Sequence, residues 1–146
     1  MASKIVFVGG GSFLWTERFA IDLFLKESLR GSHLVLVDTD AAALALLHRY
    51  VGILNERMAA GWTVETAGLD EALKDADYVM VSISTGGLEA FDRDYRIPGK
   101  YGVHHSVGDT VGPAGISRTL RNVPVFVDLA HRMERLCPHA WMINVT

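Results

Sequence analysis

Residues 5–12, Ile-Val-Phe-Val-Gly-Gly-Gly-Ser, join a short apolar run to a glycine turn, and a helical pattern begins directly after them at Phe13. A strand, a glycine turn and a helix N-terminus in this order form an anion site, because backbone N–H groups and the positive end of the helix dipole converge there. Gly9 and Gly11 match the first two glycines of the dinucleotide fingerprint G-x-G-x-x-G, whereas Leu14 occupies the third position. By itself the partial match predicts either a phosphate-binding turn or an ordinary tight turn.

A second apolar run at residues 33–37 ends in an acid, Asp38. In dinucleotide folds an acid at this place, roughly 20 residues after the glycines, accepts hydrogen bonds from the adenosine ribose. A helix predicted over residues 13–30, with Ser12 as its N-cap, explains a slightly longer spacing here. Asp38 could instead cap the next helix, although Asp40 is better placed for that role. A carboxylate at position 38 favours NAD over NADP, because it repels a 2′-phosphate.

The rest of the chain alternates between helical and strand patterns. The predicted elements are helices over residues 41–60, 69–74, 88–97 and 116–136, and strands over residues 62–66, 78–83 and 140–143. This order predicts an α/β fold, a Rossmann-like, doubly wound and mainly parallel sheet with strand 78–83 beside the first strand. Pro124 lies inside the last helix, so a kink there or a helix start near Asn122 is an alternative. Residues 98–115 hold five glycines and two prolines and are interpreted as an active-site loop.

Composition limits the partners and the compartment. The 146 residues suit one domain with a sizeable core, and the net charge of −3 gives no reason to expect a nucleic acid or an anionic membrane as partner. Cys137 is the single cysteine, so no intrachain disulfide can form, and this favours the cytoplasm as the compartment. The cysteine itself is interpreted as structural. His104 and His105 are adjacent and have no evident third ligand, so no metal site is predicted within this chain.

Several motifs together resemble one enzyme family. They are residues 8–12 (VGGGS), 36–38 (LVD), 86–90 (GGLEA), 97–98 (IP) with 100–102 (KYG), 108–113 (GDTVGP), and 137–138 (CP) with 144–146 (NVT). In this order they resemble the N-terminal part of the NAD-dependent family 4 glycoside hydrolases, a group that includes alpha-galactosidases, alpha-glucuronidases and 6-phospho-glucosidases. The Lys-Tyr-Gly and Gly-Asp-Thr-x-Gly-Pro segments are more specific for this family than the glycine turn is.

The resemblance implies an unusual glycosidase chemistry, outside the usual scheme of two carboxylates. Enzymes of this kind oxidise the sugar at C3 with NAD, remove the acidified C2 proton, break the C1–oxygen bond by elimination, and return the hydride after water has added. A divalent metal, typically manganese, polarises the sugar oxygens. The implied full-length protein cleaves glycosides in the cytoplasm and forms a homo-oligomer.

The resemblance also implies roles for individual residues. Those expected to contact the cofactor are Gly9, Gly11, Ser12 and Phe13 at the pyrophosphate, Asp38 at the ribose, and Ser82, Ser84 and Thr85 on the nicotinamide side. Asn144 is expected to contact substrate hydroxyls, and Asp109 to support the sugar or metal site. No catalytic residue and no metal ligand of the family is matched within residues 1–146. The chain is therefore expected to be an NAD-binding domain, truncated before a C-terminal α+β part that carries the metal and the substrate.

One departure bears on the substrate. Members that act on phosphorylated sugars carry an arginine in the helix after Gly-Gly, where this chain has Phe91. We therefore expect a non-phosphorylated alpha-galactoside or glycosiduronide. Two other functions remain open: an NAD-dependent dehydrogenase domain of the lactate/malate type, and a non-catalytic dinucleotide-binding domain.

Overall fold

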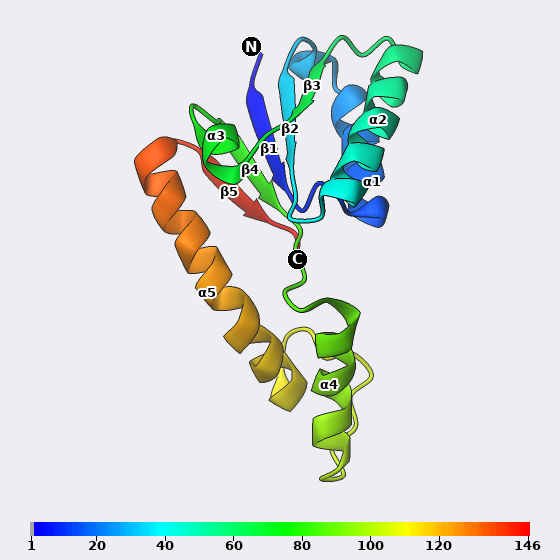
Figure 1. Ribbon diagram of the computed structural model, residues 1–146, viewed down its shortest axis with the longest axis vertical. Helices are drawn as coiled ribbons and strands as arrows, with labels where there is room; N and C mark the ends of the chain where they lie inside the picture. The colour runs from blue at the N-terminus through cyan, green and yellow to red at the C-terminus, as the bar shows by residue number, and fades with distance from the viewer. Residues whose placement is uncertain (1) are drawn as a thin grey trace. The chain divides into compact units, whose positions relative to one another are not determined.

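The computed structural model describes residues 2–146 and divides the chain into two compact units. The first, which we call the sheet unit, comprises Met1–Ile83 and Arg132–Thr146, and the second, the helical unit, comprises Ser84–His131. The elements, labelled in Figure 1, are β1 (Lys4–Val8), α1 (Phe13–Phe24), the 3₁₀ turn η1 (Glu27–Leu29), β2 (His33–Val37), α2 (Ala41–Arg57), β3 (Thr63–Thr66), α3 (Leu69–Leu73), β4 (Tyr78–Val81), α4 (Gly87–Gly99), α5 (Gly112–Leu136) and β5 (Trp141–Asn144).

The five strands form one parallel sheet in the order β3-β2-β1-β4-β5. β1 lies in the middle, and Val8 at its end is in register with Val37 of β2 and Val81 of β4. The strand order reverses between β1 and β4, which is the switch point at which such sheets bind ligands. The predicted α/β, doubly wound fold is confirmed.

The core of the sheet unit follows from the alternation of side chains along apolar strands. Ile5 and Phe7 of β1 point to one face, where they pack with buried residues of β2, α1 and α2. Figure 1 shows α1 and α2 side by side next to the sheet. Val6 points to the opposite face and is also fully buried. Each such side chain contributes about 1.5–3 kcal/mol on burial, so the strands are held from both faces.

The first helix is shorter than the sequence predicts. α1 ends at Phe24, because Lys26 takes an extended backbone (φ −88°, ψ 101°), and the 3₁₀ turn over Glu27–Leu29 follows. The apolar spacing continues past Phe24 because the turn keeps Leu29 packed against the same core cluster. The predicted helix over residues 13–30 is thus wrong in its second half.

The last helix begins earlier than predicted and is not interrupted. α5 starts at Gly112, and Pro113 stands in its first turn, where a missing backbone N–H costs nothing. Pro124 lies inside the helix, so the alternative start near Asn122 is wrong. The loop between α4 and α5 is correspondingly confined to residues 100–111.

The apolar residues of the final strand predict a buried strand, but the structure leaves this strand exposed. β5 is the edge strand, all four of its residues are exposed, and Trp141 is 71% exposed. Within residues 2–146 no other strand pairs with its outer edge.

Among the same residues, no helix combines the length and the apolar character that crossing a membrane requires.

Candidate functional site

The glycine turn at the end of β1 is held by its own backbone. The N–H groups of Gly9 and Gly10 both donate to Val37 O over 2.9 Å, which ties the turn to the end of β2. The N–H of Gly11 donates to Asp38 Oδ2 over 2.8 Å, and the N–H of Ser12 donates to Gly9 O over 3.0 Å. These four amides therefore fix the shape of the turn.

A Cβ atom added at any of the three glycines would come within 3.0 Å of another atom. Gly9 has φ +98°, and a Cβ there would lie 1.9 Å from the backbone O of Ser82, the residue directly after β4. A Cβ at Gly10 would lie 2.9 Å from Leu36 Cβ, and one at Gly11 would lie 2.8 Å from Asp38 Oδ2. The glycines let β1, β2 and β4 approach one another closely where the strands end.

The N-terminus of α1 supplies the donors that remain for an anion. Ser12 is its N-cap, as predicted, and accepts a hydrogen bond from the N–H of Trp15 over 3.4 Å. The amides of Phe13 and Leu14 belong to the first helical turn, whose N–H groups have no acceptor within a helix. The side chains of both residues are exposed, Phe13 to 76% and Leu14 to 52%. The first turn thus leaves two amides for a phosphate and is flanked by apolar surface.

Thr16 also holds the glycine turn in place, a role that the sequence analysis did not assign to it. Thr16 is 1% exposed, and its Oγ1 donates to Gly10 O over 2.9 Å. Thr16, Ala20 and Phe24 form the buried stripe of α1 at a spacing of four residues. The position of Thr16 on this otherwise apolar stripe could have indicated its role, because a buried hydroxyl needs a hydrogen-bond partner.

Asp38 lies where the ribose contact was predicted. Its Oδ2 accepts the N–H of Gly11 and its Oδ1 accepts the N–H of Asp40 over 2.9 Å. A carboxylate has about four lone-pair sites, so acceptor capacity remains for two hydroxyl groups. The capping role belongs to Asp40, whose Oδ1 accepts the N–H groups of Ala42 and Ala43. Asp38 is therefore available for a ligand while it also supports the turn.

Two more of the predicted residues lie at the same edge of the sheet. Ser82 follows β4 and donates its backbone N–H to Val8 O over 2.9 Å. Asn144 ends β5 in register with Val81, and its Oδ1 accepts the N–H of Thr146. The carboxyl edge of the sheet unit thus brings together the glycine turn, Asp38, Ser82 and Asn144.

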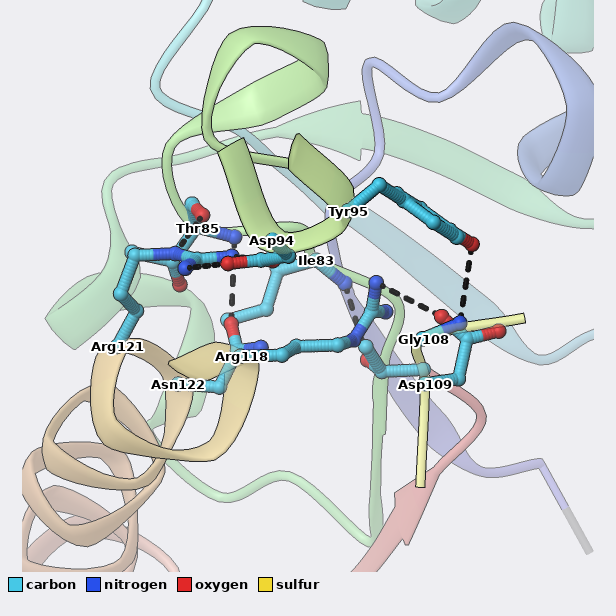
Figure 2. A network of polar contacts seen from close by, with 10 residues as sticks. Ile83, Thr85, Asp94, Tyr95, Gly108, Asp109, Arg118, Arg121 and Asn122 are labelled. Atoms are coloured by element: carbon cyan, nitrogen blue, oxygen red, sulfur yellow. Dashed lines mark hydrogen bonds and ion pairs between the residues drawn. The ribbon is translucent and has the colours of Figure 1, made fainter. Parts of the chain in front are cut away.

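The other three predicted residues, Ser84, Thr85 and Asp109, belong to the helical unit. Asp109 forms an ion pair with Arg118, with 3.2 Å between Oδ1 and Nη1, and the preceding Gly108 donates its N–H to Tyr95 Oη over 2.9 Å (Figure 2). Both contacts hold the start of the Gly-Asp-Thr segment against α4 and α5. The prediction for Asp109 named no arginine as its partner, so Arg118 was missed.

Phe91 stands at the position where family members that act on phosphorylated sugars are expected to carry an arginine. Its ring packs edge-on against Tyr95, with 4.8 Å between centroids, and the guanidinium of Arg118 lies 5.9 Å from its centroid. Arg93 pairs with Glu89 on the exposed side of α4. Phe91 therefore contributes packing and a π-face to this region.

No metal cluster is assembled by the described residues. Within residues 2–146 no group of three or more His, Cys, Asp or Glu side chains could hold a metal ion. Cys137 is buried, as a structural cysteine should be, and burial raises the pKa of its thiol. The groups that the described residues do bring together at the edge of the sheet, backbone amides and the carboxylate of Asp38, are those that bind a dinucleotide.

Comparison with known proteins agrees with this geometry. The pattern of the family described as Family 4 glycosyl hydrolase matches residues 4–146. An alpha-galacturonidase of Thermoanaerobacter italicus is 38% identical over 145 residues, which cover 98% of this chain and 31% of that protein. The chain thus spans about a third of the length of the curated relatives it matches.

Solved structures show the same similarity. A 6-phospho-alpha-glucosidase from gut microorganisms, in complex with NAD and Mn²⁺, superposes with a TM-score of 0.88 at 25% identity, over 99% of this chain and 33% of that chain. A 6-phospho-beta-glucosidase of Thermotoga maritima, solved with manganese, NAD⁺ and glucose-6-phosphate, gives a TM-score of 0.87 at 26% identity, over 97% of this chain and 34% of that chain. On the strength of the match over residues 4–146, the chain belongs to the family 4 glycosyl hydrolases.

Proposed function

We propose that this chain is the NAD-binding part of a glycosidase that cleaves O-glycosidic bonds by a redox-assisted elimination. The observation that carries the proposal is the hydrogen bond between the N–H of Gly11 and Asp38 Oδ2, which joins the phosphate turn to the ribose-binding acid. NAD in the solved relative and family membership support it.

In this proposal Gly9 and Gly11 shape the turn, and Ser12 and Phe13 contact the pyrophosphate at the N-terminus of α1. The carboxylate of Asp38 accepts hydrogen bonds from the ribose and repels a 2′-phosphate, so NAD is preferred over NADP. When bound, NAD supplies a reversible hydride acceptor for the sugar.

Ser82, Ser84 and Thr85 are proposed to line the nicotinamide side. Asn144 is proposed to bind sugar hydroxyls, which suits an amide that offers both donors and acceptors at the strand edge. Asp109 is proposed to support the sugar site through its pair with Arg118. A divalent metal, manganese in the solved relatives, is proposed for the full-length enzyme, with ligands outside the described residues.

The proposed substrate is a non-phosphorylated alpha-galactoside or glycosiduronide. Phe91 supports this, because an aromatic ring in place of an arginine cannot pair with a sugar phosphate. The name of the alpha-galacturonidase relative is in keeping with a glycosiduronide. We further propose that the full-length enzyme is a cytoplasmic homo-oligomer.

The test uses the full-length enzyme with aryl alpha-galactosides, aryl alpha-galacturonides and aryl 6-phospho-glucosides. Hydrolysis is expected to need both NAD and manganese and to leave deuterium from heavy water at C2 of the product sugar. Hydrolysis that survives removal of NAD and metal contradicts the redox-elimination proposal. Turnover of the phosphorylated sugar alone contradicts the substrate proposal while leaving the mechanism intact.

Two other functions give different results in the same assay. A lactate/malate-type dehydrogenase would reduce NAD with a hydroxy acid and release NADH, whereas the glycosidase returns the hydride and accumulates none. A non-catalytic dinucleotide-binding domain would bind NAD and turn over no glycoside. The match to the glycosidase family over residues 4–146 supports the first proposal over both.

A further inference from the structure

Both backbone polar groups of Thr85 are held by consecutive residues of α5. Arg121 Nε donates to Thr85 O over 3.2 Å, and the N–H of Thr85 donates to Asn122 Oδ1 over 3.2 Å (Figure 2). Asn122 is buried, so its amide has little freedom to turn away. Residues of α5, more than 30 positions further along the chain, thus fix the backbone of Thr85 in the loop before α4.

The cation in this arrangement is itself immobilised. Arg121 Nη1 and Nη2 donate to the two carboxylate oxygens of Asp94 over 2.7 and 2.6 Å, and Nη1 also donates to Ser117 Oγ over 3.1 Å. Asp94 is 1% exposed, and the hydrogen bonds from Arg121 lower the pKa of its carboxyl despite burial. A bidentate pair sets the plane of the guanidinium, so Nε has a defined direction toward Thr85.

The loop has little of its own to hold it. Gly86 and Gly87 both have positive φ, +85° and +60°, and residues without a Cβ are free to leave such conformations. Within the loop, the N–H of Gly87 donates to Ser84 O over 3.1 Å. The contacts from α5 therefore hold the backbone of Thr85 at both its N–H and its C=O.

We propose that Arg121 and Asn122 are positioning residues that hold Thr85 for contact with the nicotinamide half of the bound dinucleotide, with Asp94 fixing Arg121. This inference rests on the proposed function, which assigns Thr85 to the nicotinamide side. Asp38 and the glycine turn, which are proposed for the adenosine half, are held by hydrogen bonds of their own within the sheet unit.

The experiment compares two probes on the full-length protein by calorimetry: NAD, and ADP-ribose, which lacks the nicotinamide. Asn122→Leu removes the acceptor for Thr85 and is expected to weaken NAD binding about five- to tenfold, as for one lost hydrogen bond, with ADP-ribose binding unchanged within about twofold. Asn122→Asp keeps an acceptor oxygen and is expected to restore the affinity for NAD.

A second variant acts on the other contact and covers the case in which Asn122→Leu does not fold. Arg121→Lys keeps the charge but cannot donate to the carboxylate and to Thr85 O in the same fork, so the same selective loss is expected. Thermal unfolding of each variant is measured first. As the matched control, Asp38→Ala is expected to weaken both probes.

The outcomes separate the two proposals. Equal losses for NAD and ADP-ribose, unchanged NAD binding in both variants, or equal affinity of the unmutated protein for the two probes would overturn the positioning role alone. Failure of the unmutated protein to bind either probe would overturn the proposed function itself.

Discussion

The hydroxyl of Thr16 donates a hydrogen bond to the carbonyl of Gly10 over 2.9 Å, and Thr16 is only 1% exposed. This buried hydrogen bond connects the first turn of α1 to the middle residue of the glycine turn. The bond joins the element that supplies free amides to the element that sets their position. The geometry of the proposed anion site therefore depends on the buried side chain of Thr16.

Replacing Thr16 by valine keeps the volume of the side chain and removes the donor. We expect Thr16→Val to lower the free energy of unfolding by about 1–3 kcal/mol, because the buried Gly10 carbonyl loses a partner. Thr16→Ser keeps the hydroxyl and loses one methyl group, which costs about 0.8 kcal/mol. Urea denaturation of both variants measures the difference. A valine variant as stable as the unmutated protein would show that the bond contributes nothing.

Gly9 and Gly31 both have positive φ, +98° and +80°, but they differ in the space around them. At Gly31 nothing lies within 4 Å of an added Cβ, whereas at Gly9 the Cβ would lie 1.9 Å from Ser82 O. We expect Gly31→Ala to cost about 1–2 kcal/mol from backbone strain alone. Gly9→Ala should cost clearly more, since β1 and β4 must also separate. Chemical denaturation orders the two variants, and equal losses would contradict the close approach of the strands.

Asp38 is expected both to bind the ribose and to support the glycine turn. Comparing Asp38→Ala with Asp40→Ala distinguishes these roles from the capping of α2. Asp38→Ala is expected to weaken NAD binding by about 1–3 kcal/mol, and also to lower stability without ligand, because Gly11 and Asp40 lose their acceptor. Asp40→Ala removes only the N-cap of α2 and is expected to cost about 0.5–2 kcal/mol of stability with NAD affinity intact. Calorimetry and thermal unfolding give both quantities. NAD affinity that is unaffected in Asp38→Ala rules out a ribose contact.

The ion pair between Asp94 and Arg121 predicts a pH dependence. The hydrogen bonds from Arg121 lower the pKa of Asp94 below its ordinary value of 3.8, so below that pH the unfolded chain binds a proton that the folded chain does not. The stabilisation is complete above pH 3.8 and is lost as the pH falls toward the folded pKa. Asp94→Asn should cost about 1.5–3 kcal/mol at neutral pH and progressively less in acid. Unfolding curves from pH 7 downward test this, and a difference that is constant with pH contradicts it.

Cys137 is buried, and burial raises the pKa of its thiol, so little reactive thiolate is present at neutral pH. We expect a disulfide reagent to modify it slowly in the folded protein and rapidly in denaturant. The measurement is the absorbance of the released thiol with time. Rapid modification of the folded protein would mean that the end of α5 opens readily.

The sheet could be predicted because its signals are local. Apolar runs such as Ile5–Val8 report a strand buried on both faces, and the glycines and Asp38 follow those runs directly along the chain. The strand order then follows from the general behaviour of doubly wound sheets. Most of the predicted cofactor residues lie at one edge for the same reason.

Long-range polar contacts were not predictable in the same way. Arg121 and Asp94 are 27 residues apart, and nothing distinguishes Asp94 from the other charged residues of its helix until the fold buries it. The exposure of Phe13 and Leu14 was not predictable either, because an apolar residue at a helix N-terminus shows the same local pattern whether the fold buries it or exposes it. The exposure of β5 could not be predicted from its sequence either, since Trp-Met-Ile-Asn is mainly apolar, as is the inner strand β4, Tyr-Val-Met-Val.

The central place of β1 in the sheet has a consequence for synthesis on the ribosome. β1 pairs with β2 on one side and with β4 on the other, and about 40 residues separate Val37 from Tyr78. At ribosomal speed that interval lasts about 2–8 s. For those seconds one edge of β1 presents unpaired N–H and C=O groups, so the nascent chain can pair with other strands along this edge until β4 emerges.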